Sequence, residues 1–354
     1  MINKEKLKNT AVGLFAVAVG IILLVQRENA AKGISRGLSV CADVLIPSLF
    51  PFMVLSAFCV KGGLSFSGLS PVGVFCRKIL KMPCDCLTAV FFGFVGGYPV
   101  GASVISSLYE KGSADRKTAR RLMSCCVNAG PAFVITATGT VMLGNPFSGI
   151  LLFVSVCLAS VISGILFSFI YKGNAAENEI HTNSMSLSDS LIGAVTDSCR
   201  NIVLMCGWVI LFSSMSCVVT EFVPEKIVPF FLIFSEVTSG VEVARDAGGL
   251  PLVAACISSG GLCVMCQILP AIKKCGIKVY EYLLFRIVNS VFSFVITKIF
   301  LLFVDVSVSV GSFQTRVRSN SALSVAALCV MCAVFIFDIS SHRTDKMTLS
   351  DIIG

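Results

Sequence analysis

Residues 91–102 read FFGFVGGYPVGA, and residues 128–133 read NAGPAF. Four glycines and a proline interrupt the first stretch, which is otherwise apolar enough to lie inside a lipid bilayer. A backbone N–H or C=O without a hydrogen bond costs several kcal/mol in lipid, so such a break has to be enclosed by protein. In secondary transporters, hydrophobic segments interrupted by Gly and Pro indicate the binding site. The two stretches therefore predict a transporter-like membrane protein.

The composition agrees with a membrane protein. Of the 354 residues 55% are hydrophobic and 14% are charged, and the mean hydropathy is +0.89. A soluble domain of this length carries far more polar surface. We attribute the net charge of +8 to membrane topology, because no nucleic-acid-binding motif accompanies it. The 17 cysteines lie mostly in apolar runs, which indicates packing in reducing surroundings, and no metal site is expected.

Hydrophobic runs predict an all-α polytopic fold with about eight transmembrane helices. Two further segments, residues 87–109 and 228–244, are each flanked on both sides by residues of similar charge. The flanks of the first are strongly basic, and those of the second are polar with few basic residues. By the positive-inside rule each segment enters and leaves through one face, which predicts two opposed re-entrant hairpins. The spans are expected at residues 11–25, 38–60, 122–143, 148–171, 201–219, 252–271, 280–304 and 321–337.

The chain divides at a polar linker into two halves of similar order. Each half has a hairpin with a glycine-bearing tip, followed by a helix opened in its middle. Because the hairpins enter from opposite faces, the halves are predicted to be inverted repeats. Both termini are expected in the cytoplasm. The expected division is 1–37 for an N-terminal span and outer loop, 38–171 for the first repeat, 172–200 for a cytoplasmic linker, 201–304 for the second repeat, and 305–354 for a C-terminal span and cytoplasmic tail.

The interrupted stretches supply the candidate substrate-binding residues. A half-helix N-terminus offers free N–H groups and a partial positive charge, which suits an anionic substrate. Asn128 either donates its amide to the substrate or makes a helix–helix hydrogen bond. In the second half the corresponding stretch, residues 258–267, reads SSGGLCVMCQ. The candidates are Gly97, Tyr98, Pro99, Gly101, Asn128, Gly130, Pro131, Gly260, Gly261 and Gln267.

Glu236 is the strongest single candidate for a functional residue. A carboxylate at membrane depth costs about 2.5 to 3.5 kcal/mol on insertion scales, so it is usually functional. Because it would repel an anionic substrate, we assign it with Thr238 and Gly240 to a coupling proton or Na⁺; a paired structural role is the alternative. Arg286 and Lys298 are expected to balance substrate charge, although Lys298 is equally suited to snorkelling to the interface.

Five motifs, taken in order, resemble a known family. PSLFPF (47–52), GGYPVGA (96–102), NAGPAF (128–133), Glu-x-Thr-x-Gly (236–240) and GG-x-x-x-x-x-Gln (260–267) are similar to those of sporulation integral membrane proteins of the YlbJ type. This family lies in the nucleoside-transporter gate-domain group. The resemblance covers about residues 38–304. SSGGLCVMCQ is less polar than the family pattern before Gln267, which leaves that side of the site less well defined.

The resemblance implies a multi-pass protein of endospore-forming bacteria in the mother-cell-derived membrane around the forespore. It implies movement of dipicolinate, a small aromatic dicarboxylate, by hairpins that move as an elevator. We therefore expect a non-enzymatic, secondary-transporter-like protein whose partners are an anionic small molecule and the lipid bilayer. Neither nucleic acid nor a cofactor other than coupling H⁺ or Na⁺ is expected, and a homo-oligomer is left open. The alternatives are a transporter of nucleoside-like solutes and a non-transporting scaffold for spore assembly.

Overall fold

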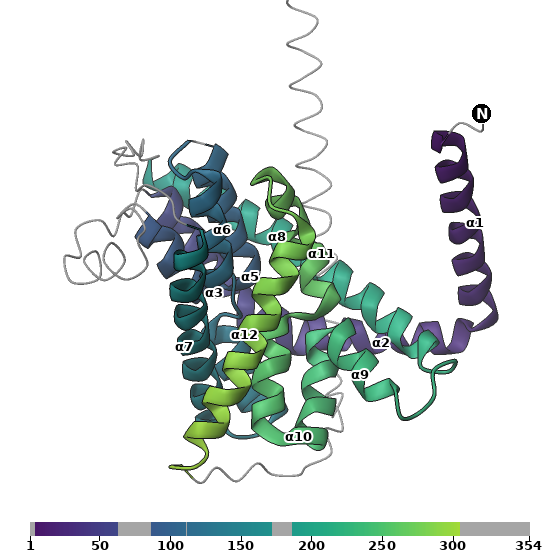
Figure 1. Cartoon of the computed structure of the whole chain (residues 1–354). Coiled ribbons are helices and arrows are strands. Elements are labelled where there is room, and N and C mark those ends of the chain that lie inside the picture. The colour runs from purple at the N-terminus through teal and green to yellow at the C-terminus, as the bar shows by residue number, and fades with distance from the viewer. Residues whose placement is uncertain (1–3, 63–85, 111, 172–185, 305–354) are drawn as a thin grey trace, which may run out of the picture.

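The computed structural model describes residues 4–62, 86–110, 112–171 and 186–304, and throughout these residues the regular structure is helical (Figure 1). The predicted all-α class is confirmed. The helices are α1 (Lys4–Val25), α2 (Arg27–Val40), η1 (Cys41–Leu45), α3 (Ile46–Lys61), α5 (Leu87–Glu110), α6 (Arg116–Cys125), η4 (Ala132–Met142), α7 (Pro146–Ile170), α8 (Leu187–Val219), α9 (Val228–Ser235), α10 (Val237–Ser259), α11 (Gly261–Lys274) and α12 (Val279–Phe300).

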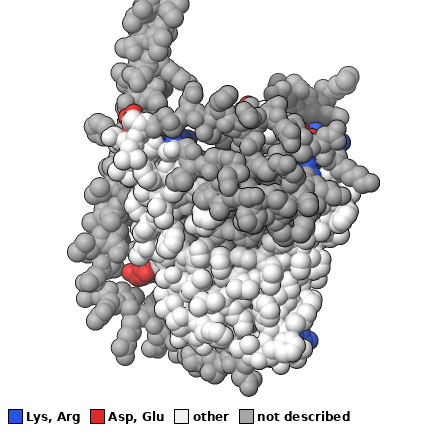
Figure 2. All heavy atoms as spheres, turned by 90° about the vertical axis from the view of Figure 1, so that its left-hand side faces the viewer, with Lys and Arg blue, Asp and Glu red and all other residues white. Residues whose placement is uncertain are grey.

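Six described helical stretches are long and apolar enough to cross a membrane, which makes this a multi-pass membrane protein. On the face that Figure 2 shows, most visible charged side chains lie near the upper edge, and the broad white surface below has only isolated ones at its margins. The predicted span at residues 321–337 lies outside the described residues. The six stretches are Arg27–Cys59, Ala89–Glu110, Pro146–Ile170, Leu187–Val219, Val237–Lys274 and Val279–Phe300, and Thr10–Val25 and Ala132–Met142 are shorter apolar helices.

Helices replace two segments expected to be irregular. Residues 27–37, expected in an outer loop, belong to α2, which runs into η1 and α3. The expected linker is helical from Leu187 onward, because the Ser186 side chain accepts a hydrogen bond from the Asp189 N–H and caps the start of α8. Figure 1 shows α1 standing to one side of the bundle formed by the other helices.

α5 is two half-helices that fold back on each other. At Gly97 the backbone leaves the helical conformation, with φ 80° and ψ −173°. A Cβ placed on Gly101 would lie 3.1 Å from the Cα of Gly93. In a straight helix, eight residues rise about 12 Å, so these two glycines meet only because the chain reverses between them. We call α5 the first helix pair and residues 96–99 its tip.

α9 and the start of α10 fold back in the same manner. Glu236, between the two helices, is extended, with φ −150° and ψ 136°. A Cβ on Gly240 would lie 3.0 Å from the Cα of Ile233, although seven helical residues span about 10 Å. We call α9 with residues 237–248 the second helix pair and residues 235–238 its tip. α10 turns again at Gly249, where φ is 65°.

Each helix pair is followed by a helix that is interrupted. The predicted span at residues 122–143 is α6, a non-helical segment at residues 126–130, and η4. The predicted span at residues 252–271 is the second part of α10 and α11, interrupted at Gly260, whose φ is 74°. The structure thus interrupts both spans at the positions that the glycines and proline predict. We call these the first break and the second break.

Candidate functional site

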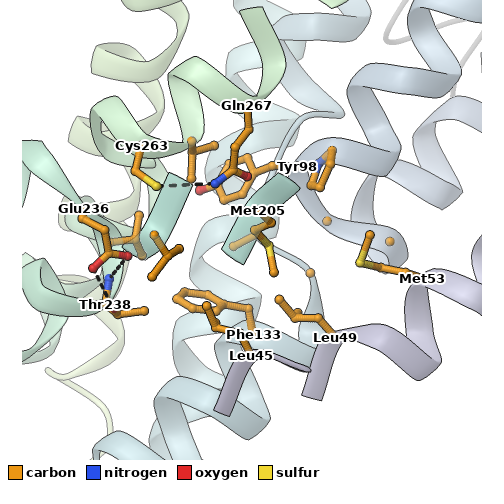
Figure 3. Close-up of a pocket in the computed structure, with 18 residues that line it drawn as sticks. Leu45, Leu49, Met53, Tyr98, Phe133, Met205, Glu236, Thr238, Cys263 and Gln267 are labelled. Atoms are coloured by element: carbon orange, nitrogen blue, oxygen red, sulfur yellow. Dashed lines mark hydrogen bonds between the residues drawn. The ribbon is translucent and has the colours of Figure 1, made fainter. Parts of the chain in front are cut away.

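A cavity of about 60 Å³ lies where both tips and the helices of both breaks approach one another (Figure 3). Its polar lining consists of Tyr98, Glu236, Thr238 and Gln267. In Figure 3 Glu236 and Thr238 lie at one end of the cavity, and Met53 lies at the other. Gly96, Gly97, Ala129 and Gly130 form part of the wall, and its apolar side chains include those of Leu45, Leu49, Met53, Phe133, Met205 and Val209.

The first tip packs directly on the first break. A Cβ on Gly130 would lie 2.9 Å from the Val95 carbonyl oxygen and 3.1 Å from Gly97 N, distances that real Cβ atoms rarely tolerate. The next residue of the tip, Tyr98, is buried, and its hydroxyl donates a hydrogen bond to the Ile257 carbonyl near the second break. Glycine at positions 97 and 130 therefore allows a backbone contact that sets the position of Tyr98.

The second tip packs on the second break through another glycine. A Cβ on Gly261 would lie 3.2 Å from the Phe234 carbonyl oxygen and 3.3 Å from that of Ser235. Gly260, beside it, faces the ring of Tyr98, since a Cβ there would lie 3.6 Å from the ring carbon that carries the hydroxyl. The two tips and the second break are thereby brought together.

Glu236 caps the helix that follows it. Its carboxylate accepts hydrogen bonds from Thr238 N at 2.8 Å and from Ser239 N at 2.9 Å, and the Thr238 hydroxyl donates to it as well. The side chain is almost wholly buried, with 3% exposed. These contacts supply the partners that a carboxylate needs when it leaves water. Glu236 thus has a local structural role in addition to its place at the cavity.

Arg286 of α12 ties the two breaks together. It is 4% exposed, and its guanidinium donates to the carbonyls of Val127 in the first break and Ser258 just before the second. The guanidinium also lies 5.1 Å from the ring centroid of Tyr98. Arg286 is not part of the cavity lining. Its hydrogen bonds satisfy backbone oxygens that the breaks leave without helical partners. The predicted role of Arg286 in balancing substrate charge therefore has no direct contact with the cavity to support it.

One turn further along α12, Asn289 continues the same connection. Its amide donates to the Ser124 carbonyl at 3.1 Å, close to the end of α6. The hydroxyls of Ser258 and Ser293 are also hydrogen-bonded to each other. Residues 286, 289 and 293 fall on one face of the helix, and that face contacts the polar backbone of both breaks.

The candidate residues separate into two groups. Seven line the cavity: Gly97, Tyr98, Pro99, Gly130, Gln267, Glu236 and Thr238. The other six lie near it but outside its lining: Gly101, Asn128, Pro131, Gly240, Gly260 and Gly261.

The second group holds the backbone in place. Gly101 faces the Cys126 carbonyl, and Gly240 faces Ile233 and the thiol of Cys256. Asn128 donates to the Cys125 carbonyl and accepts from the Ser160 hydroxyl at 2.8 Å. Of the two roles considered for Asn128, the structure shows the helix–helix hydrogen bond, with α7. Pro131 is the residue that precedes η4.

The apolar wall was not among the predicted site residues. Apart from Phe133 of η4, it comes from η1 and α3 (Leu45, Leu49, Met53) and from α8 (Met205, Val209). The PSLFPF motif, which includes Leu49, could have indicated α3 as part of the site. The α8 residues carry no such signal, because an apolar side chain facing a cavity looks the same in sequence as one facing lipid. Among the described residues no group of three or more His, Cys, Asp or Glu side chains is arranged to hold a metal ion.

Comparison with known proteins adds one relative. No family model matches the chain, and no solved structure matches it. Over 234 residues the chain is 26% identical to the sporulation integral membrane protein YlbJ of Bacillus subtilis (strain 168), a match that covers 60% of this chain and 57% of that protein. It therefore spans less than two thirds of the relative's length. The chain is thus a multi-pass membrane protein with distant homology to the sporulation integral membrane protein YlbJ.

Proposed function

We propose that this protein is a secondary-transporter-like protein that moves a small aromatic carboxylate across a membrane by alternating access, with dipicolinate as the first candidate substrate. The observation that carries the proposal is the meeting of two helix tips and two helix breaks around one buried cavity. Opened backbone at membrane depth is characteristic of transporter binding sites. The relative's link to sporulation suggests the mother-cell-derived outer forespore membrane as the location.

The packing supports two inverted repeats. In the first, α5 folds back at Gly97 and its tip contacts Gly130 in the first break; in the second, α9 and α10 fold back at Glu236 and their tip contacts Gly261 at the second break. The same glycine contact recurs at the same place in the chain order. We infer that residues 87–142 and 228–274 are two copies of one unit.

The helix pairs open toward opposite ends of the bundle. Glu110, at the open end of the first pair, is ion-paired with Lys274, with 3.0 Å between the carboxylate and the ammonium. The second pair opens at Gly249. Residues 250–274, which connect Gly249 to Lys274, rise about 37 Å if they continue in one direction, more than the hydrocarbon thickness of a bilayer. This separation supports re-entrant hairpins that enter from opposite faces.

A carboxylate substrate fits the first tip better than the second. At the second tip Glu236 already accepts hydrogen bonds from the first N–H groups of α10. At the first tip no side chain of the described residues caps residues 98–101. The helix that starts there presents a partial positive charge beside Tyr98, Phe133 and Gln267. We assign the substrate carboxylate to this tip and its ring to the aromatic side chains.

The cavity has to enlarge before it holds such a ligand. Its volume of about 60 Å³ is room for a few water molecules, whereas ligand pockets usually measure about 300 Å³ or more. Movement of one helix pair away from the other would provide the space. Alternating access includes that movement, so the closed cavity agrees with the proposal.

Reconstitution into vesicles with labelled dipicolinate, under an imposed proton or Na⁺ gradient, tests both substrate and energy source. Wild-type protein is expected to accumulate dipicolinate under one of the two gradients. Glu236→Gln is the coupling variant, because it removes the charge and keeps one of the two acceptor oxygens that now accept from Thr238 N and Ser239 N. We expect this variant to fold and to lose gradient-driven uptake. Unchanged uptake in Glu236→Gln would remove Glu236 from the coupling step.

A neutral nucleoside-like solute is the second candidate, favoured by the uncharged polar lining at Thr238 and Gln267. Competition separates the two substrates. If unlabelled nucleosides block uptake and dipicolinate does not, the carboxylate assignment is wrong. If neither is transported and Glu236→Gln leaves spore dipicolinate content unchanged, the protein acts as a scaffold in spore assembly.

A further inference from the structure

A second, larger cavity adjoins the first. It has a volume of about 440 Å³ and lies between the second half of α5, the middle of α8, and α11. The two cavities share Pro99 and Gln267, so these residues form the boundary between them. A volume of this size accommodates a small organic ligand, which the central cavity does not.

The lining of the larger cavity is polar and carries one uncompensated positive charge. Asp197 is paired with Lys61 at 2.9 Å, and Lys274 is paired with Glu110 at 3.0 Å. Arg200 also lines the cavity, is exposed, and has no ion-pair partner among the described residues. The two ion pairs cancel, which leaves the Arg200 guanidinium as the net charge of this cavity.

Neutral donors extend from Arg200 toward the boundary. Asn201 and Ser103 line the same cavity, and Ser103 is exposed to it. At the boundary the Gln267 amide donates to the Cys263 thiol at 3.5 Å, a weak hydrogen bond to sulfur. A carboxylate oxygen is a stronger acceptor and would displace that contact. The cavity therefore offers an anion a charged side chain first and an amide donor next.

The position of this cavity connects it to one end of the bundle. Lys274 ends α11 and Glu110 ends α5, and the same end carries the pair of Arg120 with Glu281. In Figure 1 α6 and the last turn of α11 lie at the upper end. This cavity therefore lies between that end of the bundle and the central cavity, with Pro99 and Gln267 at the boundary.

We propose that the cavity between α5, α8 and α11 is an access vestibule that binds a small carboxylate at Arg200 before it passes Gln267 into the central pocket. This inference rests on the proposed transport function and adds the residue that selects for an anion. An uncompensated guanidinium in a cleft with low-dielectric walls raises the local concentration of anions. Arg200 then affects how readily substrate enters and has little effect on later steps.

Three variants test the vestibule. Arg200→Gln removes the charge, and Arg200→Lys keeps it. Lys226→Gln is the matched control, because it removes an exposed cation in the α8–α9 connection, which does not line the cavity. Each is measured for equilibrium binding of labelled dipicolinate by the purified full-length protein and for uptake kinetics in vesicles. Arg200→Gln is expected to raise Kd and KM about fivefold with a maximal rate within twofold of wild type. The Kd of Arg200→Lys for dipicolinate should lie within twofold of the wild-type value, and the Kd of Lys226→Gln should equal the wild-type value.

The outcomes separate this inference from the proposed function. If the wild type transports dipicolinate and Arg200→Gln has the same Kd and KM as Lys226→Gln, the vestibule is overturned and transport stands. If the wild type binds dipicolinate without transporting it, transport is overturned. The Kd of Arg200→Gln compared with that of Lys226→Gln then still shows whether the cavity binds a carboxylate at Arg200. If the wild type binds none of dipicolinate, phthalate and benzoate, both are overturned.

Discussion

The two tips solve the same physical problem with different residues. Each begins a half-helix inside an apolar environment, where the first N–H groups of a helix lack intrahelical partners. The second tip supplies a carboxylate, and Glu236 accepts from Thr238 N and Ser239 N. The first tip turns at Gly97, with no side-chain cap among the described residues, and places proline, which has no N–H, at position 99.

The difference teaches where an external anion is accommodated. A carboxylate of the protein already occupies the second tip, so an anionic ligand there would meet both repulsion and a lack of free donors. The first tip presents the same helix polarity without an intrinsic anion. If the protein transports an anion as proposed, we expect the first tip to hold the substrate and the second tip to hold the coupling ion.

The largest effect is expected from the residue that joins the two halves. Arg286→Met would leave the Val127 and Ser258 carbonyls without their donor, and we expect a loss of about 3 kcal/mol of stability. Thermal unfolding in detergent measures it. Lys298→Met removes an exposed cation from the same helix and is expected to change stability by less than about 0.5 kcal/mol. Equal unfolding midpoints for the two variants would show that Arg286 does not hold the breaks together.

A smaller but still large effect is expected at the first tip. Gly97 has φ 80° and ψ −173°, a backbone region that only glycine adopts readily, so Gly97→Ala should cost about 1 to 3 kcal/mol. Gly207, within α8, has open space where a Cβ would be placed, and Gly207→Ala should be neutral or slightly stabilising. The comparison is made on unfolding midpoints and on dipicolinate binding. A tolerant Gly97→Ala would mean that the tip does not depend on glycine.

The second tip should respond to loss of its cap. Glu236→Ala removes the acceptors for two backbone N–H groups and should cost about 1 kcal/mol, whereas Glu236→Gln keeps one of the two acceptor oxygens and should cost less. Unfolding midpoints of the two variants give the difference. If Glu236→Ala is instead more stable than wild type, the cost of burying the carboxylate exceeds what its capping bonds contribute.

The smallest effect is expected where the halves meet at one end of the bundle. Arg120 donates to Glu281 through two nitrogens, at 3.0 and 3.1 Å, and both side chains retain some exposure. Such a partly exposed pair contributes about 0.5 to 1 kcal/mol, and salt screens it. A double-mutant cycle of Arg120→Gln and Glu281→Gln at low and high salt measures the coupling. Coupling that does not fall with salt would show that the pair is shielded from solvent.

The amino-acid sequence alone predicted the fold class and the places where helices are interrupted. Hydropathy identifies apolar runs because each residue's transfer free energy is a local property. Glycines at 97 and 260 and the NAGPAF motif predicted the interruptions, because positive φ and the missing N–H of proline are also local. The apolar wall from η1, α3 and α8 was missed, since no local signal distinguishes a cavity wall from a lipid-facing surface.

Only the tertiary structure decided which broken segments face one another. The contact of Gly130 with Gly97, the hydrogen bond from Tyr98 to the Ile257 carbonyl, and the two carbonyls joined by Arg286 each connect residues far apart in the chain or on different helices. A residue's own pattern does not specify its partner, because partner choice depends on how all the helices pack together. The sequence determined where apolar helices are interrupted, and packing determined that the two tips and the helices of both breaks approach one cavity.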